Sequence, residues 1–229
     1  MDKAGATDLA RHPAWTGLSG ALPRPYCLVY NAAMLPHAFS SPARNRRIVV
    51  IGTSGSGKTT TARQLAQRLG RPHVELDALH WEPNWTEAPL DVFQARVIEA
   101  LKGDAWVVDG NYSKVRDIVW SRADTVVWLD YSLPVILWRL VWRTLRRSLL
   151  REELWSGNRE SLRMSLFSRE SIVLWALQTY RRRRREYPVL LARPEYAHLT
   201  VLHLRSPRAA RDWLSSIEAI SDQSSAISK

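Results

Sequence analysis

Eight consecutive residues have the types and spacing needed to hold the phosphates of a nucleotide. Residues 52–59 read Gly-Thr-Ser-Gly-Ser-Gly-Lys-Thr and match the pattern G-x-x-x-x-G-K-[ST] at every position. Glycines let a backbone curl so that several N–H groups point at phosphate oxygens, and a following helix N-terminus adds the positive end of its dipole. In such a loop Lys58 can bridge the β- and γ-phosphates, and the Thr59 hydroxyl can bind Mg²⁺.

We therefore predict that ATP, or a similar nucleoside triphosphate, binds here together with Mg²⁺. The alternative is a chance match in a turn rich in Gly and Ser. A short β-branched run precedes the motif and a helical pattern follows it, so we favour nucleotide binding. The predicted nucleotide-binding residues are Gly52, Thr53, Ser54, Gly55, Ser56, Gly57, Lys58, Thr59 and Thr60.

Asp109 is the predicted carboxylate partner of the metal. It ends the apolar run 105–108 and so belongs at the carboxyl edge of a parallel sheet, where folds of this kind bind ligands. A carboxylate at that place binds Mg²⁺ directly or through water. The alternative is a turn cap supported by Gly110 and Asn111; we favour the metal-linked role.

Asp77 ends the run 73–76 in a similar way and is the predicted acceptor-site residue. It could orient an acceptor hydroxyl or act as a general base, and capping of the next turn is nearly as favoured. Asp130 also follows an apolar run. Because a Pro-led helix comes next, we interpret Asp130 as a helix cap.

Arginines crowd the region after the fourth apolar run. Arg143 and Arg147 share a helix face at i, i+4, and with Arg159 they could neutralise charge on a moving phosphoryl group. A solvated helix face is an equally favoured alternative for these three, and it is our preferred interpretation of Arg139. The run of five arginines at 181–185 could contact nucleic acid, and we lean slightly to a solvated role.

Tryptophans form two pairs in the sequence. Trp138 and Trp142 lie four residues apart in a helical pattern, and we predict that they form core or a helix–helix contact rather than a membrane-seeking face. Trp81 and Trp85 lie near Asp77. They could stack on a ring or base, and packing over a loop is equally plausible.

Strand-like and helix-like segments alternate from residue 46 onward, which predicts a five-stranded parallel sheet with helices on both faces. The predicted strands are 47–51, 73–76, 105–108, 125–129 and 199–204. The predicted helices are 58–69, 89–101, 115–121, 133–151, 171–191 and 207–220. We expect a single domain over 46–220, a poorly ordered N-terminal extension over 1–45, in which Met34 is an alternative start, and a frayed tail over 221–229.

The composition narrows the class of protein. The chain has 229 residues, 33 Lys and Arg against 22 Asp and Glu, and a formal net charge of +11. Such a charge attracts nucleotides, nucleic acid and acidic surfaces. The single cysteine, Cys27, excludes an internal disulfide. The apolar stretch 131–142 is too short for a membrane span. A cytoplasmic protein is the expectation.

Four motifs together resemble bacterial proteins known as DNA topology modulation proteins, a group of adenylate-kinase-like P-loop proteins. The motifs are residues 52–59, Asp77-Ala78-Leu79-His80-Trp81 with Pro83-Asn84-Trp85, Asp109-Gly110-Asn111-Tyr112, and Trp155-Ser156-Gly157-Asn158-Arg159-Glu160. The likeness covers roughly residues 46–213. It implies a three-layer P-loop NTPase fold, adenylate/shikimate-kinase-like, with an Arg-rich helical lid at about 143–170, and an effect on DNA.

The segment Asp77-Ala78-Leu79-His80 also resembles gluconate and shikimate kinases. In those enzymes the matching acidic segment contacts the acceptor and supports Mg²⁺, which implies the same role for Asp77. The chain lacks a Gly-Gly-Gly substrate loop after the third strand and has Gly110-Asn111-Tyr112 there instead. That departure leaves the acceptor open.

Together these patterns favour a small-molecule or nucleotide kinase that transfers the γ-phosphoryl group of ATP to a hydroxyl or phosphate acceptor. The predicted catalytic residues are Lys58, Asp77, Arg143, Arg147 and Arg159, and the predicted metal-linked residues are Thr59 and Asp109. The alternative is a nucleotide-switched, DNA-binding regulator that affects DNA topology. The charge favours it, but there is no zinc-ligand pattern or convincing recognition helix, so nucleic acid is not the favoured partner.

Overall fold

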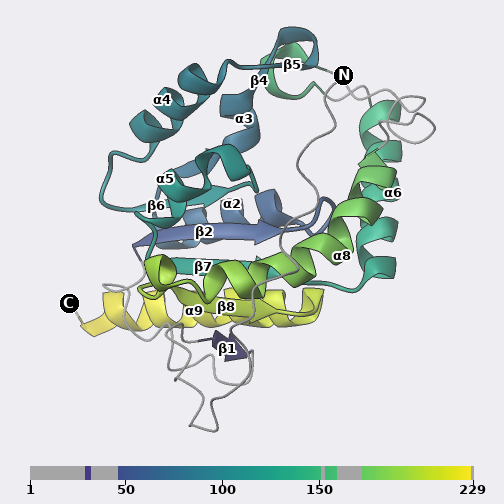
Figure 1. Cartoon of the computed structure of the whole chain (residues 1–229). Helices are drawn as coiled ribbons and strands as arrows, with labels where there is room; N and C mark the ends of the chain where they lie inside the picture. The colour runs from purple at the N-terminus through teal and green to yellow at the C-terminus, as the bar shows by residue number, and fades with distance from the viewer. Residues whose placement is uncertain (1–28, 32–45, 151–152, 159–171, 228–229) are drawn as a thin grey trace, which may run out of the picture.

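The computed structural model describes residues 29–31, 46–150, 153–158 and 172–227, in which six parallel strands form one sheet flanked by helices (Figure 1). Across the sheet the strands are β1 (Val29–Asn31), β8 (Thr200–Leu204), β7 (Thr125–Leu129), β2 (Arg47–Gly52), β6 (Trp106–Asp109) and β3 (His73–Glu75). Every neighbouring pair is parallel. The carboxyl ends of the strands therefore meet at one edge, where the phosphate-binding motif follows β2.

The five predicted strands are confirmed, and β1 is a sixth that the sequence did not predict. It lies inside the stretch 1–45, of which the remainder lies outside the described residues. Val29 to Asn31 pair with Val201 to His203 at the edge of the sheet. Backbone hydrogen bonds make this pairing, and three residues are too few to show a strand period in the sequence.

Both faces of the sheet are buried, because side chains alternate along each strand. In β2, Val49 and Ile51 enter one hydrophobic cluster, and Ile48 and Val50 enter the other. The run of β-branched residues thus matches a central strand covered on both sides.

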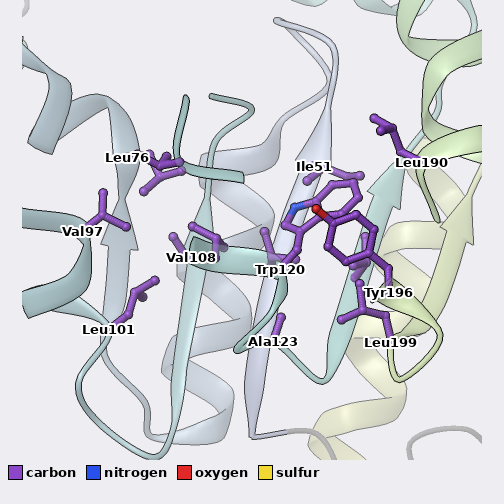
Figure 2. Close-up of a cluster of buried hydrophobic side chains, with 14 of the residues drawn as sticks. Ile51, Leu76, Val97, Leu101, Val108, Trp120, Ala123, Leu190, Tyr196 and Leu199 are labelled. Atoms are coloured by element: carbon purple, nitrogen blue, oxygen red, sulfur yellow. The ribbon is translucent and has the colours of Figure 1, made fainter. Parts of the chain in front are cut away.

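The first cluster lies under helices α4 (Leu90–Ala100), α5 (Arg116–Trp120) and α8 (Ile172–Leu191). Figure 2 shows Trp120 and Tyr196 meeting there beside Ile51, with ring centroids 5.1 Å apart in an edge-on arrangement. The second cluster lies under α2 (Lys58–Leu69), α6 (Leu133–Leu149) and α9 (Pro207–Ile227). The described part of the chain is therefore a three-layer α/β structure, as predicted.

Short elements complete the described chain. They are the helix α3 (Leu76–His80), the strands β4 (Trp81–Glu82) and β5 (Thr86–Glu87), and the 3₁₀ turns η2 (Pro83–Trp85), η3 (Ser113–Val115), η4 (Trp155–Gly157) and η5 (Pro194–Tyr196). Strands β4 and β5 pair antiparallel around η2. Asp77 lies in the first turn of α3, not at the end of a strand as predicted.

Two predictions on helices differ from the structure. Helix α9 continues past Ile220 to Ile227, because neither Gly nor Pro interrupts residues 221–227. Trp138 and Trp142 do not form core: they are 70% and 62% exposed, with their rings stacked on each other. The buried face of α6 carries Ile136, Leu140 and Thr144, and a residue two positions away from these points to the opposite side.

None of the helices in the described part of the chain combines the length and apolar character needed to cross a bilayer.

Asp130 joins helix α8 to the sheet, which corrects its prediction as a helix cap. Arg184 of α8 lies with its Nε 2.8 Å from one carboxylate oxygen, and His203 of β8 lies 3.0 Å from the other. Burial would raise the pKa of Asp130, but the hydrogen bond from His203 and the charge of Arg184 outweigh it and hold that pKa below its ordinary value. The next helix begins after Ser132 without any side-chain cap.

We predict that Asp130→Asn lowers the free energy of unfolding at pH 7 by about 1–3 kcal/mol, because a neutral amide loses the charge-assisted contacts that the buried carboxylate makes with Arg184 and His203. A carboxyl whose folded pKa is depressed contributes stability above its unfolded pKa, near 4, and loses it as pH falls through the folded value. The deficit of the variant should therefore shrink from about pH 4 downward in urea unfolding.

The control is Asp212→Asn, which breaks a surface pair with Arg208 and should change stability by less than about 0.5 kcal/mol at either pH. A pH-independent deficit in Asp130→Asn would contradict the ionic contribution.

Candidate active site

The phosphate-binding loop connects β2 to α2 and is fixed by close packing. Gly55 and Gly57 have φ of +84° and +91°, in the left-handed region that favours glycine. A Cβ built on Gly55 would lie 2.8 Å from the carbonyl oxygen of Ile136 in α6. The N–H of Ser56 donates to the Thr53 carbonyl at 3.0 Å. Helix α6 therefore holds the loop from outside, and this position admits no larger residue.

Lys58 begins helix α2 and lies beside the loop, where its Nζ is 3.5 Å from the carbonyl oxygen of Thr53. Burial, followed by the nearby charge of Arg183, lowers its pKa to about 8, although Asp77 and Asp109 act in the opposite direction. A cation crowded by other cations is stabilised by any anion that enters, such as a phosphate group.

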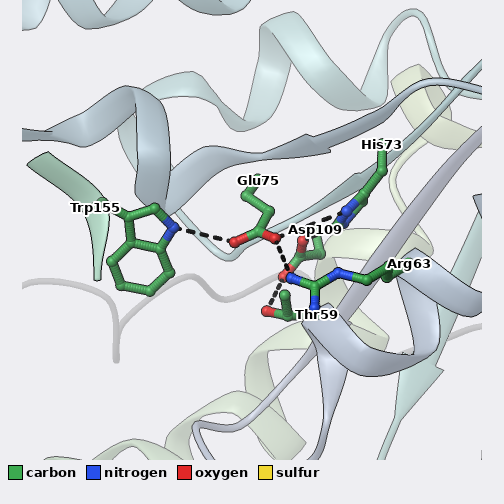
Figure 3. Close-up of polar contacts among 6 residues, drawn as sticks. All are labelled: Thr59, Arg63, His73, Glu75, Asp109 and Trp155. Carbon is green, nitrogen blue, oxygen red and sulfur yellow. Dashed lines mark hydrogen bonds and ion pairs between the residues drawn. The ribbon is translucent and has the colours of Figure 1, made fainter. Parts of the chain in front are cut away.

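The structure brings Thr59 and Asp109 together. The Thr59 hydroxyl donates to Asp109 Oδ2 at 2.7 Å, and His73 Nε2 lies 2.9 Å from Asp109 Oδ1 (Figure 3). Asp109 is only 3% exposed, at the end of the central strand β6. The predicted metal-linked pair is therefore adjacent.

Asn111 braces the start of the loop. Its amide exchanges two hydrogen bonds with the backbone of Gly52, accepting from the N–H at 3.3 Å and donating to the carbonyl. This reciprocal contact joins the segment after β6 to the end of β2.

His73, Glu75 and Trp155 were not predicted as site residues. Glu75 accepts from Arg63 of α2 at 2.9 Å and from Trp155 Nε1 at 3.0 Å (Figure 3). His73 and Glu75 are two apart in β3 and so share one face of the strand. Two ionisable residues at that spacing, in a segment that precedes Asp77, are a signal that could have identified them.

Asp77 is held by Tyr112, which follows the loop-bracing Asn111. The phenol hydroxyl donates to Asp77 Oδ1 at 2.7 Å. Burial, and then the charge of Asp77, raises the pKa of Tyr112, so the phenol keeps its proton. Its ring packs on those of Phe93 and His80, at centroid distances of 5.2 and 4.5 Å. One carboxylate oxygen of Asp77 is thus fixed by Tyr112.

A single open cavity of about 2340 Å³ connects these groups. The predicted residues that line it are Gly55, Gly57, Lys58, Thr59, Thr60, Asp77, Arg143 and Arg147, with Ser54. Thr53 and Ser56 are buried in the loop, and Gly52 and Asp109 lie directly behind it. The predicted lid covers about residues 143–170, and of these 151–152 and 159–170, which include Arg159, lie outside the described residues.

The solvated interpretation is wrong for Arg139 and, within the run 181–185, for Arg183 and Arg184. Arg139 is not merely solvated: it donates to the Ser56 carbonyl in the phosphate loop at 3.2 Å. In the run 181–185, Arg183 donates to the Gly52 carbonyl at 3.4 Å, and Arg184 pairs with Asp130. The spacing of arginines in the sequence could not show which of them bind inside the chain and which face solvent. Successive residues point to different sides of a helix, and the groups that these arginines bind lie far away in the sequence.

Parts of this chain are similar to known proteins. Residues 48–130 match the family model of ATPases associated with various cellular activities (AAA). The match runs from β2, through the phosphate-binding loop, to Asp130. A shikimate kinase from Symbiobacterium thermophilum is 35% identical over 100 residues, which is 36% of this chain. The chain spans about half of that relative's length, 56%.

Solved structures with similarity to this chain include two kinases. A gluconokinase from Sinorhizobium meliloti 1021 has a TM-score of 0.44 and 20% identity, covering 81% of this chain and 99% of its own. A shikimate kinase from Acinetobacter baumannii in complex with shikimate has a TM-score of 0.46 and 19% identity, covering 82% and 98%. The parallel sheet, the phosphate loop and the matched family model together identify the fold as that of the P-loop NTPases.

We predict that Gly55→Ala weakens ATP binding by at least about tenfold, because the new methyl would collide with the Ile136 carbonyl at a left-handed φ. Isothermal titration calorimetry measures the dissociation constant. The matched control is Gly103→Ala, where a Cβ meets nothing nearer than 3.9 Å, and its affinity should equal that of the wild type. Equal affinities in both variants would contradict the packing argument.

We also predict that ATP affinity falls as pH rises through about 8, because Lys58 loses its charge there in the free protein. A lowered lysine pKa leaves the ammonium intact below that value and neutral above it. Titrations between pH 6.5 and 9.5 on the wild type and on Lys58→Gln provide the measurement. Lys58→Gln should bind ATP more weakly, and its affinity should not fall as pH rises through about 8. A wild-type affinity that does not change with pH would refute the role of Lys58.

Proposed function

We propose that the protein is a P-loop kinase that transfers the γ-phosphoryl group of ATP to a small acceptor carrying a hydroxyl or phosphate group. One observation carries this proposal: Asp77, oriented by Tyr112, lies in the same cavity as Lys58 and Thr59. A nucleotide-binding protein without an acceptor needs no second carboxylate there. The match to a shikimate kinase over 100 residues supports the same class.

The nucleotide half uses the phosphate loop. Backbone N–H groups and Lys58 bind the β- and γ-phosphates, and the N-terminus of α2 adds a positive dipole end. The Thr59 hydroxyl and the Asp109 carboxylate, 2.7 Å apart, are oxygen donors of the kind that Mg²⁺ prefers. Mg²⁺ bound there would neutralise charge on the phosphates. His73 keeps Asp109 oriented toward Thr59.

The acceptor half begins at Asp77. Tyr112 occupies one carboxylate oxygen, which leaves the other for the acceptor. When the acceptor carries a hydroxyl, Asp77 accepts its proton as the oxygen bonds to the γ-phosphorus, and the bond to the β-phosphate oxygen breaks to release ADP. A phosphate acceptor would use the same site for orientation alone.

Cations complete the arrangement. Arg143 and Arg147 of α6 line the cavity from one side, and Arg183 of α8 reaches the start of the phosphate loop from another. Fixed positive charge that faces the transferring group stabilises it most where water is excluded. We assign Arg143 and Arg147 to this task, and Arg159 stays a prediction from the sequence.

The alternative predicted from charge, a nucleotide-switched regulator that binds DNA, has weaker support. Two of the five arginines in the run 181–185 bind groups of this chain itself, the Gly52 carbonyl and the Asp130 carboxylate. The likeness of the four motifs to the DNA topology modulation proteins remains a proposal of kinship, and it is compatible with a kinase chemistry.

The experiment measures ADP release from ATP and Mg²⁺ across a panel of nucleoside monophosphates and small hydroxyl acids. We predict that one acceptor class raises turnover sharply, that Lys58→Ala abolishes it, and that Asp77→Asn lowers it by about 10²–10⁴-fold with unchanged ATP affinity. Tyr196→Phe, which removes a hydrogen bond to Asp117 between residues that do not line the cavity, is the control and should keep full turnover. Slow hydrolysis that ignores every acceptor and rises with DNA would overturn the kinase.

A further inference from the structure

Two of the motifs found in the sequence meet in one contact that the proposed chemistry does not use. Residues 155–158, here called the strap, lie against residues 81–87, here called the hairpin. The Asn158 amide accepts from the Trp85 N–H at 2.9 Å and donates to the Glu82 carbonyl at 2.9 Å. The Ser156 hydroxyl donates to the Trp81 carbonyl at 2.7 Å. Segments about seventy residues apart are therefore joined by side-chain-to-backbone hydrogen bonds.

Backbone strain is concentrated at this contact. Within the described part of the chain, the non-glycine residues with positive φ are Asn84, Trp85 and Ser156, at 59°, 56° and 56°. Each costs about 1–3 kcal/mol and persists only where the surroundings hold it, and such strain gathers at functional sites. Asn158 is 5% exposed and accepts a hydrogen bond from the backbone N–H of Trp85, one of these strained residues.

The strap is also connected to the nucleotide half of the site. Trp155 donates to Glu75, which in turn binds Arg63 on α2, the helix that follows the phosphate loop. The strap follows α6 along the chain, and α6 packs on the loop through Ile136 and donates to it through Arg139.

The hairpin belongs to the acceptor half. It follows α3, the helix that carries Asp77, and the Ala88 N–H beyond it returns to the His80 carbonyl at 2.8 Å. Trp81 and Trp85 line the cavity from the hairpin, as Trp155 does from the strap. A displacement of the hairpin would therefore change the acceptor wall next to Asp77.

We propose that Asn158 is a positioning residue that couples the nucleotide half of the site to the acceptor wall. A nucleotide that restrains the phosphate loop against α6 and α2 also restrains the strap. The hydrogen bonds of Asn158 then restrain the hairpin. The acceptor wall is then complete only when the donor is bound, which favours transfer over hydrolysis. This inference rests on the proposed function, because it requires nucleotide binding at the loop.

Hydrogen exchange with mass spectrometry tests the coupling without an acceptor. The probe is a non-hydrolysable ATP analogue, adenylyl imidodiphosphate, with Mg²⁺. In the wild type we expect the analogue to slow exchange both in residues 53–59 and in the hairpin 81–87, the latter by at least about threefold. In Asn158→Ala the loop should remain protected, and the response of the hairpin should disappear.

Three further variants separate coupling from simple loss of structure. Asn158→Asp keeps the acceptor for the Trp85 N–H but loses the donor to Glu82, so an intermediate response is expected. Ser156→Ala removes one hydrogen bond at an exposed position, so we expect it to fold. It replaces Asn158→Ala as the test variant where that variant is unstable, and it should weaken the response of the hairpin. Tyr196→Phe, far along the chain, should respond like the wild type. Thermal unfolding confirms that each variant is folded.

The outcomes are distinguishable. A protected loop with no response of the wild-type hairpin overturns the coupling and leaves the kinase proposal intact. A hairpin response of wild-type size in Asn158→Ala overturns the role of Asn158. Absence of protection at the loop itself overturns nucleotide binding, and the inference with it.

Discussion

The arrangement of the site depends on the Asp109 carboxylate at the end of β6. One of its oxygens accepts from Thr59 on α2, and the other lies at hydrogen-bond distance from His73 on β3. Three elements that are distant in sequence thus converge on one buried anion. The interaction also fixes how α2 meets the sheet, because the hydroxyl of the second residue of that helix is committed to a neighbouring strand.

Positive charge gathers around the phosphate loop. Lys58, Arg139 and Arg183 contact the backbone carbonyls of Thr53, Ser56 and Gly52, and burial, followed by the charge of Arg183, lowers the pKa of Lys58. Such repulsion costs stability in the free protein and is relieved by a polyphosphate. Ligand binding should therefore stabilise the fold by more than contacts alone imply.

Local patterns predicted what local physics determines. The phosphate loop, the span of α2 and the five predicted strands follow from glycine spacing and β-branched runs, and the structure confirms them. The parts that were missed depend on distant partners. Asp130 looks like a helix cap in the sequence, because its partners Arg184 and His203 lie more than fifty residues away. Trp138 and Trp142 look like core residues in the sequence, but helix α6 buries its opposite face.

The edge strand β1 has a consequence for shorter forms of the chain. Val29 to Asn31 pair with the outer side of β8, and they precede Met34. A polypeptide starting at Met34 would leave the N–H and C=O groups along the outer side of β8 without that cover. An uncovered strand edge is a template for pairing with another chain. A start at Met34 would then change the tendency of the protein to self-associate more than its nucleotide binding, since residues 52–59 of the phosphate loop are retained.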